Sequence, residues 1–93
     1  MNLKCPCRSV LHIRNMRNKA HVVAVEPWAE DFTLLHGEEL EIIAFGDARV
    51  PWFVLDEWDG STQVYCNETD DFQVMQNGVE LECGHNRQPE GPA

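Results

Sequence analysis

Two short motifs near the ends of the sequence carry the side chains best suited to binding a metal ion. Cys5-Pro6-Cys7 lies near one end of the chain and Cys83-Gly84-His85 near the other. Three thiolates and one imidazole form a ligand set that Zn²⁺ accepts in tetrahedral geometry. If the two motifs were neighbours in space, one ion could join the ends of the chain. One hypothesis is therefore a small zinc-binding domain that uses Cys5, Cys7, Cys83 and His85.

The spacing inside the two motifs favours a different interpretation. Zinc sites commonly use C-x2-C, which brings two sulfur atoms to one ion from a tight turn, whereas these motifs have a single intervening residue. In the alternative, Cys5 and Cys7 lie in an N-terminal arm and Cys83 points into the apolar core. We therefore expect no cofactor, with zinc as the alternative.

The remaining reactive side chains do not form a recognisable active site. The four histidines show no H-x-H or H-E-x-x-H spacing, and no glycine-rich phosphate loop precedes a helical pattern. Acidic pairs are frequent but fall mostly in predicted turns, where carboxylates are solvated instead of converging in a cleft. We expect a protein that is not an enzyme.

Charge is distributed very unevenly along the chain. The whole sequence has 16 acidic and seven basic residues, a formal charge of −9. Five of the basic residues lie in the first 19 positions, which contain no acid. From residue 20 onward, 16 acids face only Arg49 and Arg87, which gives −14. Such a body predicts a basic protein partner and disfavours direct binding of nucleic acid by the acidic part.

Apolar and β-branched stretches separated by turn residues predict a mostly β protein. About six short strands with alternating polarity indicate a small antiparallel β-sandwich or barrel. The organisation expected is a basic N-terminal arm over 1–19, an acidic β domain over 20–83 and a flexible C-terminal tail over 84–93. No apolar run is long enough to cross a bilayer and no signal peptide is evident, so we expect a cytoplasmic protein with reduced thiols.

Two dipeptides, Asp59-Gly60 and Asn77-Gly78, predict β-hairpins with type I′ turns. The first hairpin is expected to join Val50–Trp58 to Ser61–Cys66, and the second to join Phe72–Gln76 to Val79–Cys83. Turn geometry fixes register, and register decides which side chains share a face.

In the first hairpin, Trp58 should lie opposite Ser61, which places Leu55 opposite Val64 and Phe53 opposite Cys66 on the core side. The other side should carry Trp52, Val54, Asp56 and Trp58 beside Tyr65. In the second hairpin, Cys83 should lie opposite Phe72 in the core, with Glu80 and Glu82 on the reverse side.

Aromatic side chains surrounded by charge are typical of protein interfaces. This pattern predicts a partner-binding surface, unless the arm or another sheet covers the aromatic residues and makes them part of the core. The predicted partner-binding residues are Trp52, Asp56, Glu57, Trp58, Asp59, Tyr65, Glu80 and Glu82.

The function expected is a non-enzymatic acidic protein that binds, and inhibits, a basic partner such as a nucleic-acid-binding protein. Carboxylates along strands and turns can imitate the phosphates of nucleic acid. In size and charge the chain is similar to small phage-encoded inhibitors, including anti-CRISPR proteins, although no motif supports this analogy. The alternatives are the zinc domain and a ligand-binding β-sandwich module that uses Trp52, Trp58 and Tyr65.

Overall fold

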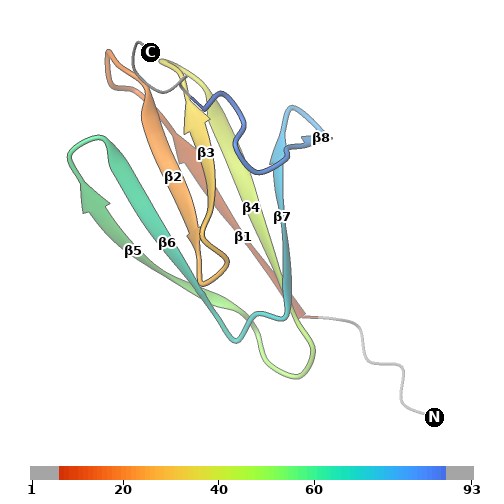
Figure 1. Ribbon diagram of the computed structural model, residues 1–93. Helices are drawn as coiled ribbons and strands as arrows, with labels where there is room; N and C mark the ends of the chain where they lie inside the picture. The colour runs from red at the N-terminus through yellow and green to blue at the C-terminus, as the bar shows by residue number, and fades with distance from the viewer. Residues whose placement is uncertain (1–6, 88–93) are drawn as a thin grey trace.

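The computed structural model describes residues 7–87, which form two four-stranded sheets around one core (Figure 1). The expected mostly β sandwich is confirmed, with eight strands instead of six. The strands are β1 (Cys7–Arg14), β2 (His21–Glu26), β3 (Glu30–Leu34), β4 (Glu39–Gly46), β5 (Trp52–Trp58), β6 (Ser61–Asn67), β7 (Asp71–Gln76) and β8 (Val79–Glu80).

The two sheets differ in their connections. One sheet has the order β1-β4-β7-β8 and is antiparallel throughout. The other has the order β3-β2-β6-β5, in which β2 and β6 run parallel and the outer pairs are antiparallel. The strands β3 and β5 are therefore the two edges of this second sheet.

Alternation of buried and outward-facing residues builds the core between the sheets. On β2 the buried positions are His21, Val23 and Val25, and on β4 they include Leu40 and Ile42. Because successive side chains of a strand point to opposite faces, this pattern gives each sheet one apolar face. The core cluster consists of Val23, Val25, Phe32, Leu34, Leu40, Ile42, Val64, Cys66 and Val74.

The prediction of an N-terminal arm over 1–19 is wrong for residues 7–14. This segment is β1, and it pairs with β4 from Cys7 opposite Gly46 to Arg14 opposite Glu39. Leu11 and Ile13 of β1 pack against the core, and an ion pair joins Arg14 to Glu39 at 3.4 Å. Part of the basic segment therefore neutralises acids inside its own sheet. Residues 1–6 lie outside the described part of the chain.

The C-terminal segment also differs from the prediction of a flexible tail that begins at residue 84. The N–H of Gly84 donates to the carbonyl of Asp31 at 2.7 Å, and the N–H of Thr33 donates to the carbonyl of His85 at 2.8 Å. Residues 84–87 therefore cover the edge of β3, while residues 88–93 lie outside the described range.

Both predicted hairpins form, but each differs in detail. Asn77 and Gly78 have φ of 51° and 79°, as a type I′ turn requires, whereas in the first turn only Gly60 is positive at 92°. The prediction of a type I′ turn at Asp59-Gly60 is therefore wrong.

The last predicted strand is shorter than expected, because β8 ends at Glu80. A bond from Leu81 N–H to the carbonyl of Val74 is 2.7 Å long, and the chain then turns at Gly84, where φ is 88°. As a result, Cys83 does not face Phe72 in the core but is exposed.

Candidate protein-binding face

The hairpin of β5 and β6 has the register predicted from the sequence. Trp58 lies opposite Ser61, Leu55 opposite Val64 and Phe53 opposite Cys66. Val64 and Cys66 are buried. Trp52, Val54, Asp56 and Trp58 consequently share the outward side of β5 with Tyr65 of β6.

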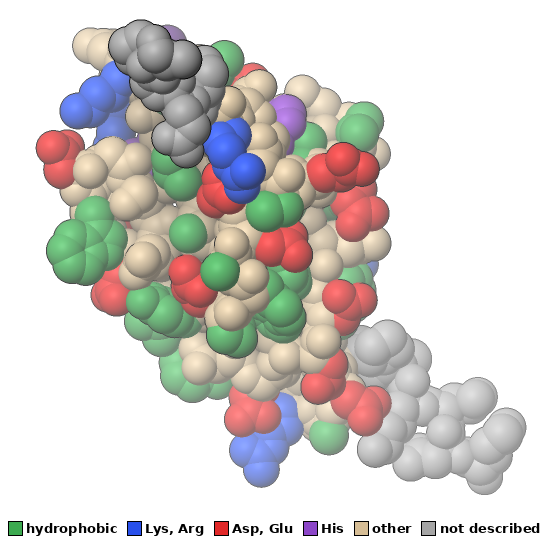
Figure 2. Space-filling view, in the orientation of Figure 1, with side chains coloured by type: hydrophobic (Ala, Val, Ile, Leu, Met, Phe, Trp, Pro, Cys, Tyr) green, Lys and Arg blue, Asp and Glu red, His purple; other side chains and the backbone are tan. Residues whose placement is uncertain are grey.

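The aromatic side chains of this hairpin are exposed. Trp58 is 63% exposed, Trp52 54% and Tyr65 37%. The Tyr65 hydroxyl donates to Oε1 of Gln63 at 2.8 Å, which holds the ring along the strand. In the described part of the chain, nothing covers these three aromatic side chains enough to make them part of the core. Figure 2 shows hydrophobic side chains among carboxylates over the region of β5 and β6.

The neighbouring strands extend this surface. The parallel pairing of β2 with β6 places Val22 beside Ser61, Ala24 beside Gln63 and Glu26 beside Tyr65, and β3 adds Asp31 beside Ala24. We call the outward side of this sheet the aromatic face. Its principal residues are Val22, Ala24, Glu26, Asp31, Trp52, Val54, Asp56, Trp58, Gln63 and Tyr65.

The sheet that carries the aromatic face is acidic. Its four strands contain five carboxylates and neither lysine nor arginine. The five are Glu26, Glu30, Asp31, Asp56 and Glu57. The opposite sheet contains four carboxylates together with Arg8 and Arg14 on β1. It is therefore the less acidic of the two sheets.

Some predicted partner-binding residues lie away from this face. Glu57 follows Asp56 on β5, so it points to the other side of the sheet, where its Oε1 accepts from Thr62 Oγ1 at 3.4 Å. Asp59 is in the adjoining turn, 3.7 Å from Lys19 Nζ. Glu80 lies on β8 in the other sheet and Glu82 follows that strand. The structure brings together Trp52, Asp56, Trp58 and Tyr65, with Asp59 at the rim.

The metal ligand set proposed from the sequence is not assembled by the described residues. Within residues 7–87, no group of three or more His, Cys, Asp or Glu side chains is placed to hold an ion. Cys7, Cys83 and His85 thus do not form a cluster of three, and Cys5 lies outside the described range.

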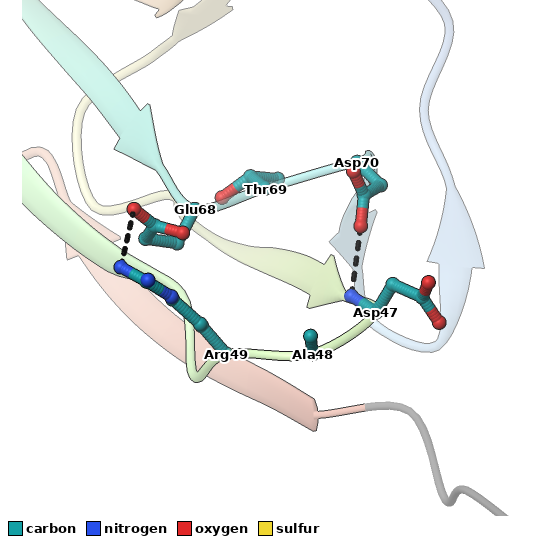
Figure 3. A pocket seen from close by; sticks show the side chains of 6 residues that line it. All are labelled: Asp47, Ala48, Arg49, Glu68, Thr69 and Asp70. Atoms are coloured by element: carbon teal, nitrogen blue, oxygen red, sulfur yellow. Dashed lines mark hydrogen bonds and ion pairs between the residues drawn. The ribbon is translucent and has the colours of Figure 1, made fainter.

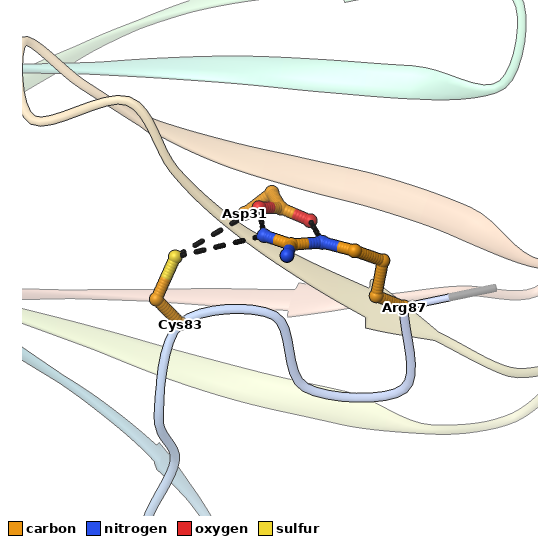
Figure 4. A network of polar contacts seen from close by, with 3 residues as sticks. All are labelled: Asp31, Cys83 and Arg87. Carbon is orange, nitrogen blue, oxygen red and sulfur yellow. Dashed lines mark hydrogen bonds and ion pairs between the residues drawn. The ribbon is translucent and has the colours of Figure 1, made fainter. Parts of the chain in front are cut away.

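Cys83 instead belongs to a polar network at the edge of β3 (Figure 4). The guanidinium of Arg87 donates to both carboxylate oxygens of Asp31, through Nε at 3.2 Å and through NH2. The Cys83 thiol lies 3.8 Å from Asp31 Oδ1. Hydrogen bonding from Arg87 lowers the pKa of Asp31. This network fixes residues 83–87 against the sheet.

A polar hollow of about 400 Å³ lies at one end of the sandwich, between the loop after β4 and the loop after β6 (Figure 3). Asp70 Oδ2 accepts from the N–H of Asp47 at 2.7 Å, and Arg49 pairs with Glu68 at 3.6 Å. The acids here hold the two loops together, and none of the aromatic residues proposed for a ligand-binding module lines the hollow.

A buried polar pair lies behind the aromatic face. His21, 1% exposed, has Nε2 2.8 Å from the hydroxyl oxygen of Thr62, which is 2% exposed. Burial is the main cause that lowers the pKa of His21, and Arg17 acts in the same direction. Because neither side chain reaches the surface, the pair can stabilise the pairing of β2 with β6 but cannot contact a substrate.

Comparisons of the chain with protein families, with curated proteins and with solved structures found no match. Within residues 7–87 no helix is long and apolar enough to span a membrane. The functional argument therefore depends on the aromatic face. Sequence reasoning missed its β2 and β3 residues, although the alternation of His21, Val23 and Val25 could have placed Val22 and Ala24 outward.

Proposed function

We propose that this chain is a non-enzymatic interaction protein that binds a basic protein partner through the aromatic face. One observation carries the proposal: Trp52, Trp58 and Tyr65 are exposed together on a sheet whose strands contain five carboxylates and neither lysine nor arginine.

The aromatic residues supply the affinity in this proposal. Trp and Tyr are enriched among the residues that dominate binding energy, because they bury a large area with few rotatable bonds. Trp52 and Trp58 lie at opposite ends of β5, with Val54 between them on the same side. A partner that covers this row would remove two indole rings and one valine from water at once.

The carboxylates supply selectivity and speed. Asp56 lies between Val54 and Trp58 on the outward side of β5, and Asp59 lies in the adjoining turn. A net charge of −9 attracts a basic partner at long range and raises the association rate, and salt weakens both effects. An acidic partner would be rejected by like-charge repulsion.

A finer form of the proposal concerns the partner. A basic surface that fits Asp56 and Asp59 is also suited to phosphates, so the chain would occupy a site on a nucleic-acid-binding protein and inhibit it. Competition tests this form directly: duplex DNA or RNA should displace the chain from the partner as concentration rises. If nucleic acid and the chain bind together without loss of affinity, mimicry is refuted while partner binding stands.

The experiment that tests partner binding compares two charge reversals. Partners are captured from a lysate at low and high salt, and the affinity of the recovered partner is then measured by calorimetry. Asp56→Lys should weaken binding at least about tenfold, because it places a cation inside the face. Glu80→Lys is the matched control, since it makes the same charge change on β8 of the other sheet.

Both variants should keep the wild-type free energy of unfolding, because exposed substitutions of this kind have small effects. Equal affinities of the two variants for the recovered partner would refute the role of the aromatic face. An affinity of the wild type that does not fall with salt would refute the role of charge.

A further inference from the structure

Among the four sheet edges of the described residues, β5 is a long open edge that lacks basic side chains, whereas β1, one residue longer, carries them. β8 has only two residues. The edge of β3 is covered by residues 84–87. β1 carries Arg8 and Arg14, cations of the kind that protect edge strands from unwanted pairing. β5 has seven consecutive residues paired with β6 without a bulge, and it contains no proline, lysine or arginine. Figure 1 shows β5 at the outer margin of its sheet.

The backbone of β5 presents a regular row of hydrogen-bonding groups to solvent. The Val22 N–H donates to the Gly60 carbonyl at 2.9 Å, and this bond fixes which backbone N–H and C=O groups of β6 face β2. The N–H and C=O groups of Gln63 and Tyr65 consequently face β5. Their partners on β5 are Asp56 and Val54. Because the groups of an edge strand alternate in direction, the N–H and C=O of Phe53, Leu55 and Glu57 point away from the sheet.

Apolar side chains lie on both sides of this row. Leu55 lies opposite buried Val64, on the side of β5 that faces the sandwich interior, yet it is 41% exposed. On the outward side Val54 is 42% exposed and the two tryptophans still more. Natural edge strands that are not used for binding avoid this combination of free backbone groups and exposed apolar side chains.

We propose that β5 is the edge at which an extended basic segment of the partner adds as a ninth strand. This inference rests on the proposed function and specifies how the partner binds. Main-chain hydrogen bonds to Phe53, Leu55 and Glu57 supply affinity, and alternate side chains of the added strand supply specificity.

Charge selects the occupant. Asp56 and Glu57 place a carboxylate on each side of the edge, and Asp59 adds a third at the turn. A partner segment with lysine or arginine near both carboxylates makes a favourable electrostatic interaction with each. Apolar residues between these cations cover Leu55 on the inner side and Val54 on the outer side. A second copy of the chain would instead bring two further carboxylates to the same edge, with a net charge of −9 on each copy.

Synthetic peptides of alternating lysine and valine, eight residues long, test the pairing on the full chain. Three companions are needed: one with valine N-methylated, one with lysine N-methylated and one with glutamate in place of lysine. Only alternate residues of an added strand point their N–H groups at the edge, so these are either the valines or the lysines. The peptide methylated at that set should bind at least about tenfold more weakly than its parent. The glutamate peptide should not bind. Bound parent peptide should slow amide exchange at Phe53, Leu55 and Glu57, measured by nuclear magnetic resonance.

Leu55→Pro provides the matching change in the protein. Its N–H points to solvent, so proline removes a donor from the open edge without removing a bond to β6. The variant should lose binding of the lysine–valine peptide and of the captured partner. If the variant does not fold, the N-methylated peptides decide the matter on the wild-type chain.

Equal affinities of all three basic peptides, unchanged exchange at the three amides, or no binding of the parent peptide would overturn the proposal. A concentration-dependent dimer of the wild type that Leu55→Pro abolishes would also overturn it, because a second copy would then occupy the edge. If Leu55→Pro binds the captured partner normally while Asp56→Lys does not, strand addition is refuted and the proposed function survives.

Discussion

Two of the three tryptophans, Trp58 and Trp28, allow a direct test of whether the aromatic face is free for binding. Trp58 is 63% exposed, so it hides roughly 90 Å² of a side chain that can bury about 250 Å². At about 25 cal/mol per Å² this area contributes at most about 2 kcal/mol, and partial burial in the denatured chain lowers the figure to about 1.5 kcal/mol. Trp58→Ala should therefore lower the free energy of unfolding by about 1.5 kcal/mol.

Trp28 is the matched control, because it packs against the core and against Phe72, with ring centroids 4.5 Å apart. Trp28→Ala should cost about 3 kcal/mol, near the lower end for a packed aromatic residue. Urea unfolding followed by circular dichroism measures both variants. A loss for Trp58→Ala as large as that for Trp28→Ala would show that Trp58 is covered, and the aromatic face would then not be a free surface.

Three further outcomes follow from the buried and crowded positions of the fold. Burial lowers the pKa of His21 from 6.5, so the unfolded chain binds a proton more readily than the folded one. The free energy of unfolding should therefore fall as the pH drops below about 6.5 and stay level above it. Urea titrations from pH 5 to 8 check this, and the same dependence of the free energy of unfolding on pH in His21→Leu would contradict it. Burial raises the pKa of Cys66 to about 11. Iodoacetamide at pH 8 should therefore modify exposed Cys83 in the folded protein and Cys66 only after unfolding. Rapid modification of both thiols in the folded protein would contradict the burial of Cys66. Gly46→Ala should cost about 2 kcal/mol in urea unfolding, because its Cβ would clash with the carbonyl of Arg49, and wild-type stability would contradict this crowding.

Local signals predicted the part of the fold that depends on neighbouring residues. The Asp59-Gly60 turn fixed the register of β5 and β6, and alternation then placed Trp52, Asp56 and Trp58 on one side, as the structure has them. The same reasoning placed Cys66 in the core, where it is 8% exposed.

Long-range pairing was beyond these signals. Cys7–Arg14 appeared to be an arm because its outward positions are largely basic, yet its partner β4 begins 25 residues later and supplies the matching acids Glu39 and Glu41. Residues 84–87 lack apolar side chains, but they are held by backbone bonds to β3, which composition does not reveal.

The candidate site was only partly predictable for the same reason. Trp52, Asp56, Trp58 and Tyr65 lie on one hairpin, so local register brought them together. Glu80 was assigned to the site from its outward direction on a second hairpin. The sequence holds no local signal that this hairpin belongs to the opposite sheet, which is decided by the pairing of β7 with β4.

Hydrogen–deuterium exchange of the chain bound to its captured partner tests the central claim most directly. The aromatic face predicts that the partner slows exchange in β5 and β6, between Trp52 and Asn67, and leaves β1 and β4 of the opposite sheet unchanged. Protection confined to β1 and β4, with β5 and β6 exchanging as in the free protein, would contradict the claim.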